Sequence, residues 1–154
     1  MKIFVTGTRG IPDIPGGVEK HCQELYPRIV QKGHKVTLAT RSPYVKNSYS
    51  CWNGVDLVKC FAPKSKSIEA LVHTLLSIFA ARDLKPDIVH IHAVGPSLVT
   101  PVSKMLGFRT VVTNHGPEYD RLKWGKIAKL VLKLAERLGT KYANEVIAVS
   151  SVAR

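Results

Sequence analysis

Cysteines, long apolar runs and a leader segment are scarce or missing in this sequence. The three cysteines, Cys22, Cys51 and Cys60, have no CxxC spacing, which argues against a disulfide framework or a zinc site and favours reduced thiols. No stretch approaches the roughly 18 uninterrupted apolar residues that a membrane span requires. The first residues enter a strand pattern directly, without the regions of a signal peptide. We therefore expect a cytoplasmic protein, soluble or peripheral at the inner face of the membrane.

Acidic and aromatic residues are also few. Asp and Glu total 11 against 23 Lys and Arg, which gives a formal net charge of +12 at pH 7. A field of this size attracts phosphorylated lipids, anionic membranes, nucleotide diphosphates or nucleic acid. Aromatic residues make up only 7% of the chain and no nucleic-acid-binding motif is present. Nucleic acid, which charge alone supports, is therefore not the expected partner.

The sequence does hold enough apolar residues for a core. Hydrophobic residues make up 45% of the 154 residues, a length typical of one domain. Short apolar runs alternate with amphipathic segments, and continuous apolar strands are typical of parallel sheets covered on both faces. We predict an α/β fold, a Rossmann-like doubly wound parallel sheet of about six strands.

The expected elements follow from apolar periodicity and from helix caps. The predicted strands are residues 2–5, 35–39, 55–61, 88–92, 109–113 and 145–149. The predicted helices are residues 17–31, 67–82, 97–106 and 124–142, with Ser67 as an N-cap and a further helix starting at Ser150. Residues 41–53 are expected to form a loop. Since that last helix has only four more residues, we expect the chain to be truncated.

The segment between the first strand and the first helix is rich in glycine. Gly16 and Gly17 stand at the predicted helix start, where free backbone N–H groups and the helix dipole favour an anion. Arg9, in the same loop, is a candidate cationic contact or a solvated surface residue. The loop is thus a candidate phosphate site, and a plain turn is the alternative.

This loop also permits a dinucleotide interpretation. The string Thr-Gly-Thr-Arg-Gly-Ile resembles the start of the extended short-chain dehydrogenase fingerprint, but the third glycine is replaced by Asp13. Arg41, at the end of the second strand, would suit the phosphate of NADP. An NADP-dependent oxidoreductase is therefore kept as the less favoured alternative.

Histidines lie at the end of one predicted strand and directly after the next. Strand alternation places His90 and His92 on one face, with His92 at the crevice where open parallel sheets bind ligands. Two such histidines would need further ligands for a metal, so no metal is expected. Asn114 and His115 follow the fifth strand, where an imidazole can take a proton from a hydroxyl or bond a sugar.

Six motifs in order give the chain a family resemblance. They are the opening strand, the Pro-Gly-Gly-Val-Glu-Lys-His helix start, Gly33-His34-Lys35-Val36, the strand at residues 86–92, Thr113-Asn114-His115-Gly116 and the strand at residues 146–151. In these the chain resembles the N-terminal domain of GT-B retaining glycosyltransferases, specifically glycosyltransferase family 4. The Thr-Gly-Thr-Arg-Gly-Ile-Pro opening is also similar to rhamnosyltransferase-like members that act on cell-surface polysaccharides.

The resemblance implies that residues 1–154 form the acceptor-side half of a two-domain enzyme that moves a sugar from a nucleotide sugar to a glycan or lipid-linked acceptor. The donor-binding half, with its E-x₇-E motif, is absent, so the chain alone is expected to be inactive, and a subunit of a split glycosyltransferase is an alternative. By the same resemblance, Gly16 and Gly17 lie against the donor, Glu19 and His92 near the acceptor, and His115 is the active-site histidine. Arg9 and Asp13 have no general family role, and no cofactor is implied.

One of the predicted helices is strongly basic. Residues 121–142 carry an apolar stripe of Ile127, Leu130, Val131, Leu134 and Leu138 beside several lysines. The stripe predicts a helix that covers the sheet with a solvated basic face. The alternative is a surface that meets anionic lipid through Lys126, Lys129 and Lys133.

Overall fold

The structure is a computed structural model that describes residues 1–45, 50–65, 68–116 and 125–149. Its described strands form one seven-stranded sheet in the order β3-β4-β2-β1-β5-β6-β7. They are β1 (Lys2–Thr6), β2 (Lys35–Arg41), β3 (Cys51–Trp52), β4 (Val55–Cys60), β5 (Ile88–His92), β6 (Thr110–Asn114) and β7 (Glu145–Ala148). Every pairing is parallel except that of β3 with β4. The predicted α/β class with a doubly wound, mostly parallel sheet is confirmed.

The seventh strand corrects the prediction of a loop over residues 41–53. Cys51 pairs with Asp56 and Trp52 with Val55 across Asn53-Gly54. Both turn residues have positive φ, 46° at Asn53 and 81° at Gly54. An Asn-Gly pair of this conformation closes a two-residue hairpin. The Asn-Gly pair is a hairpin signal that can be recognised in the sequence. The strand before it was missed because it has only two residues and follows a polar segment.

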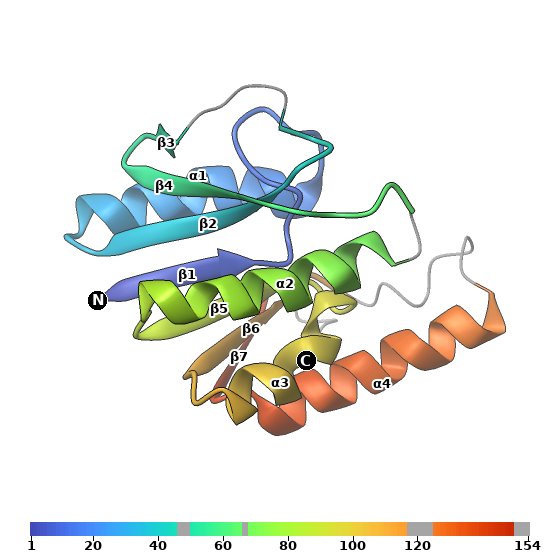
Figure 1. Ribbon diagram of the computed structural model, residues 1–154. Coiled ribbons are helices and arrows are strands. Elements are labelled where there is room, and N and C mark those ends of the chain that lie inside the picture. The colour runs from blue at the N-terminus through green and yellow to red at the C-terminus, as the bar shows by residue number, and fades with distance from the viewer. Residues whose placement is uncertain (46–49, 66–67, 117–124, 150–154) are drawn as a thin grey trace.

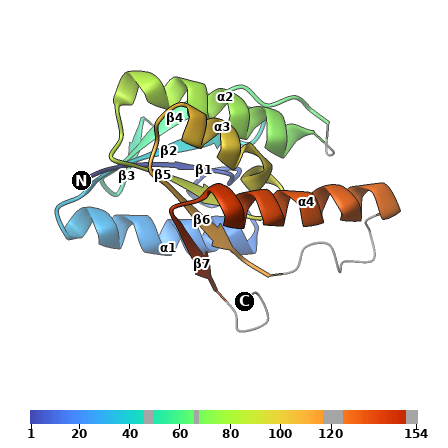
Figure 2. The same cartoon turned by 90° about the horizontal axis from the view of Figure 1, so that it is seen from below.

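Helices cover both faces of the sheet (Figures 1 and 2). The described helices are α1 (Gly17–Gln31), α2 (Glu69–Leu84), the 3₁₀ helix η1 (Pro96–Val99), α3 (Thr100–Met105) and α4 (Lys126–Tyr142). The prediction for α1 matches at both ends. The predicted helix over residues 97–106 is instead a 3₁₀ turn followed by a short α-helix. Ser67 and Ser150, the two predicted N-caps, lie outside the described residues; α2 itself begins at Glu69.

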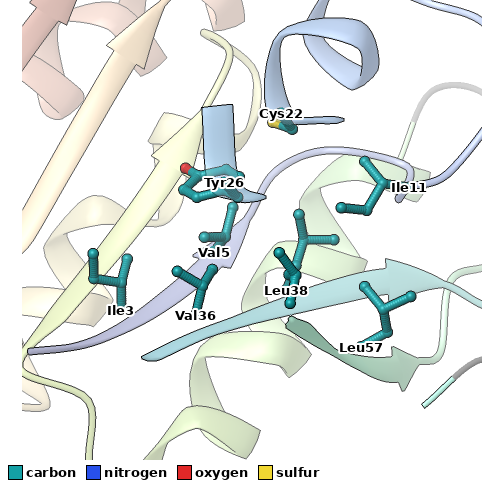
Figure 3. Close-up of a cluster of buried hydrophobic side chains, with 9 residues drawn as sticks. Ile3, Val5, Ile11, Cys22, Tyr26, Val36, Leu38 and Leu57 are labelled. Atoms are coloured by element: carbon teal, nitrogen blue, oxygen red, sulfur yellow. The ribbon is translucent and has the colours of Figure 1, made fainter. Parts of the chain in front are cut away.

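Two apolar clusters fill the space between the sheet and the helices. On one face, Ile3, Val5, Val36 and Leu38 pack under α1, and Tyr26 of α1 lies among them (Figure 3). On the other face, Phe4, Ala39, Val89, Ile91 and Val112 pack under α2, η1 and α3. Alternation along the strands therefore assigns successive residues to opposite layers.

The helix α4 does not bury the apolar stripe that the sequence displays. Its buried residues are Leu132, Ala135 and Gly139. A Cβ on Gly139 would lie only 2.8 Å from the Ser97 hydroxyl, so α4 packs very closely against η1 at this residue. The predicted stripe is exposed instead, with Ile127 at 81% and Leu130 at 69%. The expectation that the stripe covers the sheet is therefore wrong, because the close approach of Gly139 to Ser97 turns the other side of α4 inward.

Candidate active site

The candidate site lies at the carboxyl edge of the sheet, where β1 and β5 are neighbours. Strand order reverses between these two strands, and such a switch point is where open α/β sheets bind ligands. The loop after β1 comes directly against the end of β5, because a Cβ on Gly7 would overlap the backbone carbonyl of His92. Gly7 has a φ of +93°, which a residue with a side chain rarely adopts. Two segments far apart in sequence therefore meet here.

A chain of hydrogen bonds runs through the site from the interior to its edge. The Oγ1 atom of Thr113 lies 2.7 Å from Nε2 of His90. The hydroxyl of Tyr26 lies 2.9 Å from Nδ1 of His90 and 2.5 Å from Nε2 of His92. Nδ1 of His92 lies 3.0 Å from Nε2 of His115. Three histidines, a tyrosine and a threonine thus form one connected series, which we call the histidine chain.

Burial keeps the rings of the histidine chain neutral. Burial lowers the pKa of His90 to about 4, with His21 and His115 adding to the effect. The pKa of His92 falls well below its ordinary value, first by burial and then by the neighbouring histidines. Burial and His21 also lower the pKa of His115 to about 4, although Glu19 opposes this. All three rings are therefore uncharged at neutral pH.

His115 is held in place by its neighbour Asn114. Oδ1 of Asn114 accepts from the backbone N–H of Gly116 at 3.0 Å, and its Nδ2 donates to Glu136 of α4 at 2.9 Å. An Asn that bonds the backbone two residues ahead fixes a tight turn. The turn leaves His115 half-buried beside His92 and places His21 of α1 against it, with ring centroids 5.1 Å apart. Asn114 therefore positions the histidine from within the turn.

The partly exposed Arg9 and the buried Glu19 form an ion pair beside the histidines. Glu19 accepts from Nε and Nη2 of Arg9, both at 3.1 Å, and from the Arg9 backbone N–H at 3.0 Å. Burial of the Glu19 carboxyl opposes ionisation, but these hydrogen bonds outweigh it and leave the pKa of Glu19 below its ordinary value. Arg9 also donates to the carbonyl of Pro15 at 2.6 Å. The pair fixes the loop after β1 onto the start of α1.

A second ion pair, buried on both sides, occupies the end of β2. Nη1 of Arg41 donates to Glu69 at 2.8 Å, and Nη2 donates to the carbonyl of Gly7 at 3.2 Å. The Tyr44 hydroxyl donates to the other oxygen of Glu69, and the guanidinium of Arg9 lies over the Tyr44 ring. Arg41 is therefore committed to the interior, which argues against its use for the phosphate of NADP.

The structure gathers most of the predicted site residues into two groups. His92, Asn114 and His115 lie together, and Gly16, Arg9 and Glu19 form a second group around the start of α1. Gly17 begins α1, and a Cβ there would meet nothing within 4 Å. His90 and His92 share one face, as alternation predicted, because both contact Tyr26.

Tyr26 and His21 are the site residues that sequence reasoning missed. Glu19, Cys22 and Tyr26 are the buried residues of α1, at spacings of three and four. That spacing marks the inward face of the helix, but it does not reveal which strand the helix faces. Among the described residues, no group of three or more His, Cys, Asp or Glu side chains is arranged to hold a metal ion.

Comparison with known proteins assigns the chain to a family. The family model described as Glycosyltransferase Family 4 matches residues 15–154. The chain belongs to glycosyltransferase family 4. Among solved structures, it is similar to CalG4, the calicheamicin glycosyltransferase, with 15% identity and a TM-score of 0.47 over 92% of this chain. The chain spans 42% of the length of that protein. No curated protein sequence matches the chain.

Proposed function

We propose that this family member is the acceptor-side, N-terminal half of a two-domain GT-B glycosyltransferase. The two-domain enzyme as a whole moves a sugar, with retention, from a nucleotide sugar to a glycan or lipid-linked acceptor of the cell-surface polysaccharide type. The match of residues 15–154 to the family carries the proposal. The carboxyl edge of the sheet supports it, because a buried polar site gathers at the point where such sheets bind ligands.

In this proposal the site works by position and electrostatics rather than by a nucleophile. His115 is half-buried and neutral, so it can bond a sugar or phosphate oxygen without being desolvated as an ion. The N-terminus of α1 supplies free N–H groups at Gly16 and Gly17, near the place where a donor diphosphate would lie. The pair of Arg9 and Glu19 holds that helix start in place, which is a positioning role.

An anionic membrane surface is the second partner in the proposal. Four side chains of α4 are exposed although apolar: Ile127, Leu130, Val131 and Leu134. Lys126, Lys129, Lys133 and Arg137 lie along the same helix. The first turns of α4 extend past the strands in both views (Figures 1 and 2). An exposed apolar stripe beside lysines fits the interface of an anionic bilayer, which brings the site to a lipid-linked acceptor. No helix among the described residues is long and apolar enough to cross a membrane.

The test is a transfer assay that separates the two halves of such an enzyme. The gene is read beyond codon 154, and the longer protein and the 154-residue chain are each incubated with labelled UDP-, GDP- and dTDP-sugars and a lipid extract. We expect transfer only when a donor-binding domain is present, on the same chain or added as a separate subunit. Loss of transfer in His115→Ala, with transfer retained in Met105→Ala, would support the site. Binding of NADPH in the absence of any sugar transfer would overturn the proposal.

A further inference from the structure

The histidine chain has a direction, because each link contains one proton. In a neutral histidine one ring nitrogen carries a hydrogen and the other accepts. Tyr26 has a single hydroxyl proton but lies between Nδ1 of His90 and Nε2 of His92. It can therefore donate to one ring and accept from the other, or else leave its proton unused. The tautomers of the three rings are consequently linked.

One arrangement gives every proton of the chain a partner. The Thr113 hydroxyl donates to Nε2 of His90, whose Nδ1–H donates to Tyr26. The Tyr26 hydroxyl then donates to Nε2 of His92, whose Nδ1–H donates to Nε2 of His115. The remaining proton of His115 is on Nδ1, the ring nitrogen that has no hydrogen-bond partner among the described residues. In this arrangement His115 offers a free N–H group.

Two other arrangements each leave a buried hydroxyl proton without a partner. If every bond is reversed, Thr113 accepts from His90, and its own proton has no acceptor in the described part of the chain. If both His90 and His92 donate to Tyr26, the phenol proton has none. Thr113 is 1% exposed and Tyr26 is 0% exposed, so bulk water does not reach either hydroxyl. An unpaired buried hydroxyl disfavours either alternative by roughly ten- to a hundredfold.

Groups outside the chain do not change this preference. His21 lies beside His92 and His115, but its ring contacts them without a hydrogen bond among the described residues. Glu19, whose charge acts on His115, is already bonded to Arg9 and Thr8. The direction of the chain is therefore set at its inner end, by the Thr113 hydroxyl.

We propose that Thr113, His90, Tyr26 and His92 hold His115 in the Nδ1–H tautomer, so that His115 presents a hydrogen-bond donor, and not a base, to the substrate. Given the proposed function, the acceptor of this bond is an oxygen of the transferred sugar or of the donor diphosphate. The four inner groups are positioning residues, since they act through His115. Thr113 selects the tautomer of a ring to which it is joined only through three intermediate side chains.

The experiment reads the tautomer directly, by long-range ¹H–¹⁵N correlation of the histidine rings at pH 7 in protein labelled at histidine. In the wild-type protein we expect a protonated Nδ1 and an unprotonated Nε2 at His115, at roughly ten to one or more. Thr113→Val removes the hydroxyl with little change in shape, and we expect it to bring that ratio close to one. Thr113→Ser restores the hydroxyl and with it the wild-type pattern. Tyr26→Phe disconnects the two ends and is expected to resemble Thr113→Val.

The outcomes separate this proposal from the proposed function. A protonated Nε2 at His115 in the wild-type protein overturns it, even if no variant folds. A folded Thr113→Val protein that keeps the wild-type ratio also overturns it. Failure of sugar transfer with the Nδ1–H tautomer present overturns the function but leaves the tautomer assignment in place. Sugar transfer by a protein whose His115 is protonated at Nε2 overturns the tautomer assignment but leaves the proposed function in place.

Discussion

The backbone of Gly16 passes so close to the carboxylate of Glu19 that no side chain fits between them. A Cβ at Gly16 would overlap that carboxylate and the guanidinium of Arg9, and the φ of Gly16 is +149°. Gly17, the next residue, has open space around its Cα. The two glycines of the pair therefore have different structural requirements, although the sequence makes them look equivalent.

Gly16→Ala is expected to lower the free energy of unfolding by about 2–4 kcal/mol, because it combines backbone strain with a steric clash against the ion pair. Gly17→Ala is the matched control, and we expect it to change stability by less than about 1 kcal/mol. Urea denaturation of both variants provides the measurement. Equal losses in the two variants would contradict the described packing.

Glu19→Gln is expected to destabilise the protein by about 1.5–3 kcal/mol at pH 7, because the charge-assisted bonds from Arg9 are lost. The pKa of Glu19 is lowered on folding, so the contribution of its charge is complete above the ordinary value of 4.5 and is lost as the pH falls toward the folded value. The difference in the free energy of unfolding between the wild type and Glu19→Gln should therefore become smaller below pH 4.5 in urea titrations. Glu24→Gln is the control, because its ion pairs are exposed and contribute little.

His73 is a buried histidine of α2 whose two ring nitrogens have no hydrogen-bond partner in the described residues. Burial, with a smaller effect of Arg41, lowers its pKa to about 4, and a weaker interaction with the backbone of Thr40, which falls short of hydrogen-bond geometry, opposes this shift. We expect His73→Leu to raise the free energy of unfolding by about 1–3 kcal/mol at pH 7, because an unpaired polar group is removed.

The stabilisation expected for His73→Leu should increase as the pH falls. Unfolded His73 takes up a proton below pH 6.5, whereas the folded residue remains neutral to about pH 4, so the wild-type protein loses stability in that window. The loss amounts to at most about 1.4 kcal/mol per pH unit. Thermal or urea unfolding between pH 7 and pH 4.5 measures it. A pH-independent difference would show that folding does not lower the pKa of His73.

Replacement of Lys126, Lys129 and Lys133 by Glu is expected to reduce co-sedimentation with vesicles of phosphatidylserine and phosphatidylcholine, because each lysine near an anionic surface contributes about 1 kcal/mol. The matched control places Glu at Lys32, Lys59 and Lys85, which makes the same change in net charge on other elements. Equal binding by the two triple variants would show that only total charge matters.

The apolar part of the same surface is tested by Ile127→Gln combined with Leu130→Gln. Both side chains are largely exposed, so stability should change by less than about 1 kcal/mol while vesicle binding weakens. Met105→Gln on α3, at a residue that is 86% exposed, is the control. Unchanged vesicle binding would rule out insertion of the α4 stripe.

The sequence predicted where the six main strands lie along the chain and the bounds of α1, because apolar runs and the Gly33 stop are local signals. It also placed His90 and His92 on one face, since alternation along a strand is local. It did not predict which face of α4 is buried, because the close contact of Gly139 with Ser97 depends on tertiary packing. For the same reason it did not join Tyr26 to the histidines of a distant strand.

The bond between Tyr26 and His92 joins residues 66 positions apart, and that between His90 and Thr113 joins residues 23 apart. Contacts of such long sequence separation close long loops and carry the entropic cost of closing them, so they are expected late in folding. The site therefore becomes complete only when α1, β5 and β6 have all docked. The chemical shifts of its histidines would then report on the folding of the whole domain, from a few atoms at one edge of the sheet.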